Sequence, residues 1–284
     1  MVSGDPFSTG LVYAAGRSRI GAYDRATLFV STDHGQTWSS RAADTTSGAS
    51  GYACLVSRAD TGMVYIGGSK GIVARTTNRG QTWTRCSYGL TPTTRVYSLD
   101  QHLQDPDIMV AGCSTGVYRT TNRGTSWFRT SAALPFCRVA LSPAQPEIGY
   151  TAHERVYVTT DAGQTWFVPE PGLRFGEFRG LAAHPDSARW AFACGSEGIH
   201  LTTDAGTHWV PTDCGAGYVR VPCIGVCRSD PDHVYAEVRG SMIYRSLSGG
   251  ETWTRCEPFP ACGSICALGV GTESNLVYAL EGWT

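Results

Sequence analysis

Four arginines recur at nearly the same place in a repeated sequence pattern, and their spacing points to a binding site. They follow a tryptophan by 12, 11, 13 and 11 residues. Guanidinium groups bind carboxylates and phosphates through paired hydrogen bonds. If the four side chains converge, they form a positive patch that attracts an acidic ligand or partner. The arginines are Arg95, Arg138, Arg179 and Arg220, and the tryptophans before them are Trp83, Trp127, Trp166 and Trp209.

The same arginines have a structural alternative, in which each forms a separate ion pair. Asp100 and Glu177 are acids that can serve as such partners. Both interpretations remain open, because the meaning of the spacing depends on the elements that position the arginines.

Those elements are set by an eight-residue motif that occurs six times, with a Ser or Thr first, a Gly fifth and a Trp last. Its tryptophans are separated by 45, 44, 39, 43 and 44 residues. A period near 44 residues is typical of one four-stranded propeller blade. The motif occupies residues 31–38, 76–83, 120–127, 159–166, 202–209 and 246–253.

Each period also contains short β-rich runs, and no segment shows a sustained helical pattern. In one period the runs are expected over 52–57, 63–67, 71–76 and 82–86. The Asp or Asn of the motif can close a turn through nearby backbone N–H groups, and its glycine permits a positive φ. The tryptophan is expected to bury a large apolar area between sheets.

The six motifs resemble the Asp boxes of sialidases, sortilin-type receptors, xyloglucanases and photosystem II assembly-factor propellers. The resemblance covers essentially the whole chain and implies an all-β fold, a single β-propeller domain over residues 1–284 with four-stranded blades. In those families the Asp box is structural and lies away from the active face. Three copies depart from the aspartate, and the serine is expected to weaken its turn; the substitutes are Asn78, Asn122 and Ser248.

The number of blades is predicted to be six, with seven as the alternative. In the six-bladed interpretation, residues 264–270 supply the inner strand that the N-terminal blade lacks. The strand expected over 276–280 is then surplus. Seven blades would leave two of them incomplete.

The resemblance to sialidases also implies where catalytic groups would lie, although no complete set is found. Arg220-Val-Pro222 followed by Tyr235-Ala-Glu-Val-Arg239 is similar to the opening repeat of that family. Arg17 and Asp24, in a loop expected over 16–27, resemble its arginine and acid positions. No Tyr–Glu nucleophile pair can be assigned by motif. The candidate catalytic acids are Asp24, Glu177 and Glu237.

Composition excludes several other classes of function. The chain has 23 Lys+Arg and 24 Asp+Glu, a net charge of -1, which argues against nucleic acid or an anionic membrane as the main partner. No apolar stretch approaches the ~18 residues of a membrane span. The 11 Cys and seven His form no metal-binding motif, so neither metal nor cofactor is expected.

The expected compartment is the cytoplasm, because the N-terminal residues do not read as a signal peptide. An extracytoplasmic location is the alternative if a leader has been removed. In a reducing compartment the cysteines are expected to be small buried hydrophobic residues, with disulfides as the alternative.

These observations favour a non-catalytic binding or assembly scaffold that presents the four arginines to a protein partner or an acidic ligand. The resemblance to photosystem II assembly factors, which hold a client protein with an arginine patch, implies the same. The alternative is a sialidase-like glycoside hydrolase, or a carbohydrate-binding lectin, that uses the candidate acids.

Overall fold

The computed structural model describes residues 2–4, 10–20, 22–43, 48–60, 62–131, 134–170, 173, 176–212, 219–238, 242–256, 265–270 and 277–281. These residues form strands, turns and loops and include no helix, which confirms the all-β prediction. The chain divides into two compact units, Met1–Val139 (unit 1) and Ala140–Thr284 (unit 2), which are considered separately. The single domain over residues 1–284 stays a prediction.

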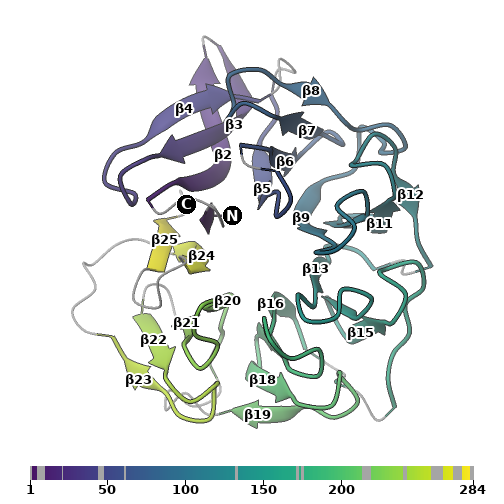
Figure 1. Cartoon of the computed structure of the whole chain (residues 1–284), viewed down its shortest axis with the longest axis vertical. Helices are drawn as coiled ribbons and strands as arrows, with labels where there is room; N and C mark the ends of the chain where they lie inside the picture. The colour runs from purple at the N-terminus through teal and green to yellow at the C-terminus, as the bar shows by residue number, and fades with distance from the viewer. Residues whose placement is uncertain are drawn as a thin grey trace. The chain divides into compact units, whose positions relative to one another are not determined.

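Unit 1 contains three antiparallel sheets whose four strands follow one another in chain order (Figure 1). The first sheet comprises β1 (Val2–Gly4), β2 (Val12–Ile20), β3 (Tyr23–Ser31) and β4 (Ser39–Ala42). The second comprises β5 (Gly51–Val56), β6 (Val64–Gly68), β7 (Val73–Thr76) and β8 (Thr84–Arg85). The third comprises β9 (Val96–Gln101), β10 (Met109–Cys113), β11 (Gly116–Thr120) and β12 (Phe128–Arg129).

Burial in these sheets decreases from the second strand to the fourth. Every residue of β6 and β10 is buried, whereas both residues of β8 and of β12 are exposed. β6 and β10 contain no charged residue, as expected for strands covered on both faces, and the fourth strands have only two to four residues. The strands predicted over residues 52–86 are therefore confirmed to within about two residues at each end.

Unit 2 continues the same pattern, and the boundary between the units falls within β13. A three-stranded sheet comprises β13 (Arg138–Leu141), β14 (Gly149–Ala152) and β15 (Val156–Thr159). The next sheet has four strands, β16 (Phe178–Ala183), β17 (Ala191–Gly195), β18 (Gly198–Thr202) and β19 (Val210–Thr212). A further four-stranded sheet comprises β20 (Cys223–Val226), β21 (Val234–Val238), β22 (Met242–Ser246) and β23 (Thr254–Arg255). A two-stranded sheet comprises β24 (Ile265–Val270) and β25 (Val277–Glu281).

The pairing predicted for residues 264–270 is wrong. In the described part of the chain, β24 pairs with β25. The edge strand that pairs with β2 is β1, whereas the six-bladed interpretation placed residues 264–270 in that position. Three residues of β1 are enough to pair with Val12–Ala14, so the first sheet needs no donated strand. The number of blades, six or seven, stays a prediction.

The loop predicted over 16–27 is a β-hairpin. β2 and β3 pair continuously from Val12↔Ser31 to Ile20↔Tyr23. Arg17 and Arg19 are exposed whereas the residues between and before them are half-buried, which is the period-two pattern of a strand with one covered face. That alternation indicates a strand, and the prediction of a loop did not take it into account.

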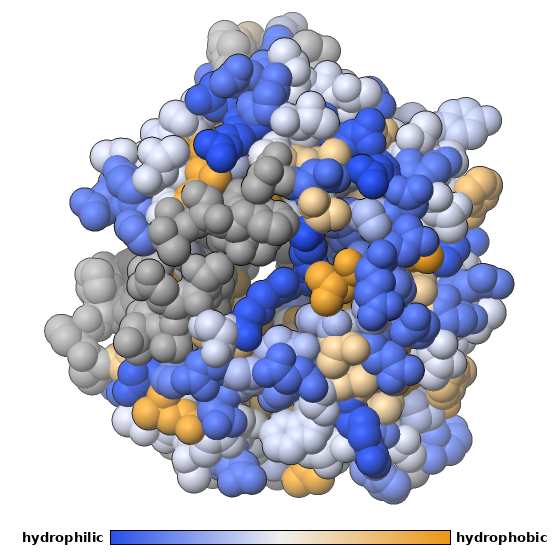
Figure 2. Space-filling model, in the orientation of Figure 1, coloured by the Kyte–Doolittle hydropathy of each residue, from blue (hydrophilic) through white to orange (hydrophobic). Residues whose placement is uncertain are grey.

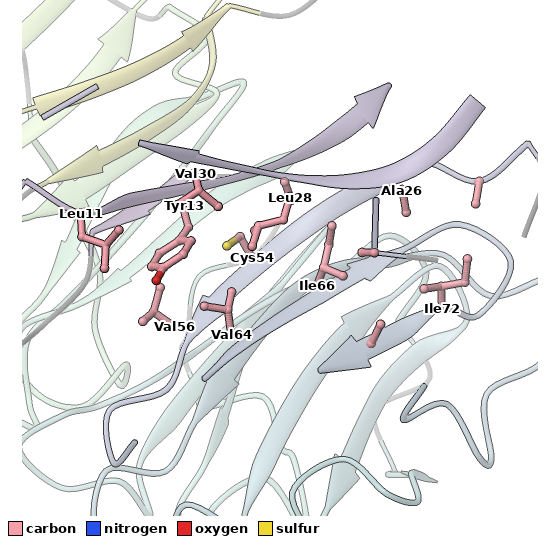
Figure 3. Close-up of a cluster of buried hydrophobic side chains, with 14 residues drawn as sticks. Leu11, Tyr13, Ala26, Leu28, Val30, Cys54, Val56, Val64, Ile66 and Ile72 are labelled. Carbon is pink, nitrogen blue, oxygen red and sulfur yellow. The ribbon is translucent and has the colours of Figure 1, made fainter. Parts of the chain in front are cut away.

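The core of the first two sheets lies between them and is almost entirely aliphatic. Figure 3 shows Tyr13 and Leu28 from the first sheet beside Cys54 and Ile66 from the second. Tyr13, Leu28 and Ile66 have no exposed surface. Burying one such aliphatic side chain contributes about 1.5–3 kcal/mol, so packing between sheets is a major source of stability.

The Asp boxes form the turns that the sequence predicts. In the first, Asp33 Oδ1 accepts a hydrogen bond from the backbone of Thr37 at 2.8 Å, and Ser31 Oγ accepts one from the backbone of Gly35 at 2.8 Å. The other five boxes repeat both bonds, with Ser248 Oγ in place of the carboxylate in the last. The box glycine has a positive φ in every copy. The Asp box therefore has the structural role predicted for it.

The surface seen in Figure 2 has its hydrophobic residues in small groups among hydrophilic ones. Few large hydrophobic side chains of the described residues are more than half exposed. They are Tyr23, Tyr88, Phe128, Phe136, Val210 and Leu247.

Candidate functional site

The sheets have two distinct sides along their strands. The first strand begins on the same side as the turn between the second and third strands, because neighbouring strands are antiparallel. We call this the start side. The Asp boxes follow the third strand and lie at the opposite end of the strands, which we call the box side.

In unit 1, the structure places Arg95 and Arg138 on the start side of adjacent sheets. Arg95 directly precedes β9 and is exposed, and its backbone N–H donates to Ser114 Oγ at 2.9 Å. Arg138 is the first residue of β13, and its Nη1 donates to the backbone carbonyl of Tyr97 at 2.6 Å. Since Tyr97 lies two residues after Arg95, the backbone of β9 links the two positions.

Three aromatic residues accompany these arginines, and sequence reasoning missed them. The rings of Tyr52 and Tyr97 have centroids 5.7 Å apart, and those of Tyr97 and Phe136 are 5.8 Å apart. We call Tyr52, Tyr97 and Phe136 the aromatic row. Each lies within two residues of the start of β5, β9 or β13. Tyr52 and Tyr97 both follow a box tryptophan by 14 residues, a recurrence that alignment of the repeats would have revealed, whereas Phe136 follows Trp127 by nine.

In unit 2, Arg179 forms an ion pair with Glu177 on the start side. Its Nη2 lies 3.0 Å from Glu177 Oε2, and its Nε lies 3.3 Å from the same oxygen. Both side chains are about half exposed, so the ion pair is in contact with water and contributes little to the free energy of folding. One of the ion pairs proposed as the structural alternative is therefore present.

Arg220 and His153 lie close enough to Glu177 to affect its charge. The hydrogen bond and charge of Arg179 lower the pKa of Glu177, and the charges of Arg220 and His153 lower it further. Glu177 therefore stays ionised throughout the neutral range. We call Glu177, Arg179, Arg220 and His153 the Glu177 cluster. Its net charge is positive, because two guanidinium groups surround one carboxylate.

The structure thus places Arg95 and Arg138 on the start side of unit 1, and Arg179 and Arg220 near Glu177 on the start side of unit 2. The convergence of all four on one site stays a prediction. Asp100, the other acid proposed as a partner, has its Oδ1 3.0 Å from Arg58 Nη2 on the box side of unit 1.

The three candidate acids occupy very different surroundings. Asp24 lies on the β2–β3 hairpin of unit 1, where its Oδ2 is 3.2 Å from Arg17 Nη1. Glu177 belongs to the Glu177 cluster on the surface of unit 2. Glu237 lies within β21 and has no exposed surface, so a substrate in solution cannot contact it.

The other sialidase-like feature, Tyr235, is also unsuited to attack a substrate. It is 4% exposed, and burial raises the pKa of its phenol. A buried, protonated phenol is a poor nucleophile.

The described residues contain no group of three or more His, Cys, Asp or Glu side chains that could hold a metal ion. Eight of the cysteines in this part of the chain form no disulfide; they are Cys54, Cys86, Cys113, Cys137, Cys194, Cys223, Cys227 and Cys256. Burial raises the pKa of Cys54 to about 12, so this thiol is inert at neutral pH.

Comparison with known proteins identifies the fold. Residues 26–155 match the family described as Sortilin-Vps10, "Sortilin, neurotensin receptor 3". No curated protein sequence matches the chain significantly.

Similar solved structures include glycoside hydrolases and a peptide-binding protein. A GH74 xyloglucanase from Xanthomonas campestris is 18% identical with a TM-score of 0.77, over 99% of this chain and 50% of that chain. A GH74 enzyme from Niastella koreensis is 12% identical with a TM-score of 0.62, over 99% and 62% of the two chains. YCF48 bound to D1 peptide is 17% identical with a TM-score of 0.68, over 99% and 88%.

These similarities confirm the predicted Asp-box type of β-propeller. The chain spans only 50% and 62% of the two GH74 chains, but 88% of the YCF48 chain. Within the residues that the structure describes, no helix has the length and apolar character that a membrane crossing requires.

Proposed function

We propose that the chain is a non-catalytic binding propeller that presents arginines on its start side to an acidic segment of a protein partner. The arginines are Arg95, Arg138, Arg179 and Arg220. The observation that carries the proposal is the exposure of Arg95, Arg179 and Arg220 at the beginnings of first strands. The framework needs none of these three side chains, because the sheets are held by apolar packing and the Asp boxes.

The electrostatics of the Glu177 cluster support an acidic partner. A carboxylate of the chain itself already lies beside Arg179, which supports the proposal that a partner's carboxylate binds there. A partner's carboxylate can take the same position or bind Arg220 beside it. Charge-assisted pairs with arginine of this kind are strong when a partner excludes water from them.

The structural neighbours are compatible with a peptide or protein partner. YCF48 has been solved with D1 peptide, and the present chain covers 88% of that protein at a TM-score of 0.68. We infer by analogy that a propeller of this size binds a polypeptide segment on one of its faces.

A glycoside hydrolase or lectin is the second candidate, favoured by the TM-score of 0.77 with a xyloglucanase. The candidate acids argue against hydrolysis, since Glu237 is buried and Glu177 is held ionised by Arg179. A glycosidase general acid must carry a proton at working pH, which requires a raised pKa.

The proposal is tested by affinity capture from the native host with tagged parent protein and with Arg95→Ala, Arg179→Ala and Arg220→Ala. Matched controls are Arg79→Ala in unit 1 and Arg189→Ala in unit 2, which remove exposed arginines from the box side. The expected result is a specific partner that the start-side variants lose and the controls retain. Each start-side substitution should weaken binding by about 1–3 kcal/mol if the contact is desolvated.

A parallel screen against aryl glycosides, including a sialoside, separates the two candidates. Turnover that Glu177→Gln abolishes would replace the scaffold proposal with an enzymatic one. Equal capture by all five arginine variants would show that the working face lies elsewhere.

A further inference from the structure

The two sides of unit 1 differ in charge. Among the described residues, the box side holds the acids Asp33, Asp60, Asp100, Asp105 and Asp107 together with Arg58, Arg79 and Arg123. On the start side the described acid is Asp24, which Arg17 already pairs. The same side holds Arg17, Arg19, Arg25, Lys70, Arg95 and Arg138. The start side of unit 1 is therefore strongly positive, although the whole chain is nearly neutral.

The aromatic row lies within this positive side and supplies an apolar surface. Tyr52 and Tyr97 are half-buried, and Phe136 is 55% exposed. The neighbouring rings are inclined by 34° and 33°, so they form one continuous strip across the starts of three successive first strands. Arg138 Nη1 donates to the backbone carbonyl of Tyr97, and Arg95 lies two residues before Tyr97 in the chain.

Phe136 is held in a conformation that a phenylalanine rarely adopts. Its φ is 56°, in the left-handed region where a bulky side chain is an outlier. The residues around it are fixed, since Leu134 and Cys137 are buried and the backbone N–H of Cys137 lies 3.4 Å from the carbonyl of Cys113. Strained residues of this kind cluster at ligand sites. Here the residue in this conformation carries an aromatic ring that is 55% exposed and lies two residues before Arg138.

We propose that the aromatic row, with Arg95 and Arg138, binds a segment of a partner protein in which an aromatic or long aliphatic side chain neighbours a carboxylate. The apolar side chain packs on Phe136 and Tyr97, and the carboxylate pairs with Arg95. This inference rests on the proposed function and adds to it an apolar anchor in unit 1. Interface energy commonly concentrates in such an aromatic residue beside an arginine.

The geometry favours a polypeptide over single-stranded nucleic acid, which also binds arginines and aromatic rings. Nucleic acid requires open ring faces on which successive bases stack. In the aromatic row the rings lean on one another, and Phe136 alone is more than half exposed. The net charge of -1 also provides no overall attraction for a polyanion.

The test uses the full chain, fluorescence anisotropy and three labelled probes. The first probe is an octapeptide rich in phenylalanine and glutamate, the second has serine for each phenylalanine, and the third is an oligothymidylate. The parent should bind the first probe at least about tenfold more tightly than the second, as expected for a buried aromatic anchor. It should bind the third weakly at physiological salt.

The decisive variant is Phe136→Gly, because glycine accepts φ of 56° without strain and should fold at least as well as the parent. It should lose at least about tenfold in affinity for the first probe. The matched control is Phe128→Ser, which removes another exposed phenylalanine of unit 1, 65% exposed on β12, and should bind as the parent does.

Three outcomes would overturn the inference: no binding of the first probe by the parent, equal binding by Phe136→Gly, or tighter binding of the oligothymidylate. Failure of the proposed function is distinguishable from these. If Arg95→Ala loses the native partner while Phe136→Gly retains it, the proposed role of the arginines is supported and the proposed role of the aromatic row is wrong.

Discussion

Trp127 donates a hydrogen bond from its indole Nε1 to the backbone carbonyl of Cys86, 2.9 Å away. Cys86 directly follows β8 and Trp127 directly precedes β12, so the bond joins the outer strands of neighbouring sheets in unit 1. The tryptophans of the other five Asp boxes donate to the glycine carbonyl of their own box. Trp127 is therefore hydrogen-bonded to the backbone of the preceding sheet, and Trp253 also donates to a side chain of the sheet before its own, Thr212 Oγ1, at 2.9 Å.

Replacing Trp127 by alanine should lower the free energy of unfolding by about 3–5 kcal/mol, as for other large buried side chains. The indole is 2% exposed, and its loss would also leave the Cys86 carbonyl without this donor. Urea denaturation measures the change. Trp38→Ala is the matched control and should cost clearly less, because Trp38 is 38% exposed. Equal costs would contradict the role given to Trp127.

The first Asp box should make stability depend on pH below about 4. Hydrogen bonds from Thr37 and Ser31 lower the pKa of Asp33 to about 2, below its unfolded value of about 3.9. The contribution of this carboxylate is present above the unfolded pKa and is lost as pH falls towards 2. Asp33→Asn should therefore flatten the stability profile between about pH 4 and 2 in denaturant titrations. Asn78→Asp, in the second box, should steepen it.

Two Asp boxes contain an alanine where the last box has a glycine. Ala162 and Ala205 have φ of 55° and 60°, and the corresponding Gly249 has φ of 60°. A side chain in this left-handed region costs about 1–2 kcal/mol, part of which the greater freedom of unfolded glycine offsets. Ala162→Gly should therefore raise the unfolding free energy by up to about 1 kcal/mol, measured by thermal denaturation. Gly249→Ala should lower it, and the opposite signs would contradict the left-handed geometry.

The Arg58–Asp100 ion pair should be structural. The two side chains are 10% and 13% exposed, with Nη2 and Oδ1 3.0 Å apart. Removing one partner leaves a largely buried charge, so Asp100→Ala should cost about 3–5 kcal/mol. In a double-mutant cycle, Arg58→Met with Asp100→Ala should cost less than the sum of the single changes. Strict additivity would show that the pair does not interact energetically.

Glu177→Gln should strengthen acidic-partner binding severalfold. The substitution removes the carboxylate that Arg179 holds, which leaves both guanidinium groups of the Glu177 cluster for a partner. Its melting temperature should match that of the parent, because the pair is exposed to water. Isothermal titration with the captured partner measures the effect. Glu197→Gln, a nearby exposed acid, serves as the control, and weaker binding by Glu177→Gln would contradict the proposed site.

Features that repeat six times could be predicted from the sequence, because each copy supports the others. The Asp-box turns, the all-β fold and the location of the arginines at the starts of strands follow from the same period. The pairing of 264–270 could not be predicted, because β1 has only three residues. A run this short is too brief for an alternating pattern to identify it as a complete strand.

The candidate site was predicted only in part, because side-chain direction and burial decide it. Arg179 and Glu177 are two residues apart in sequence, and their ion pair was anticipated. Glu237 looks like a catalytic acid in sequence and yet has no exposed surface in β21. Phe136 was overlooked because it lies in a loop of irregular length, where its ring is brought to Tyr97 by the backbone.

Lys70 provides a reactive primary amine on the start side of unit 1. It is the lone lysine of the printed sequence and is exposed in the turn between β6 and β7. The next residue, Gly71, donates its N–H to the carbonyl of Thr94, which directly precedes Arg95. Among the side chains of this molecule, an amine-reactive cross-linker would therefore modify the lysine near Arg95, and it would join covalently a partner that docks there.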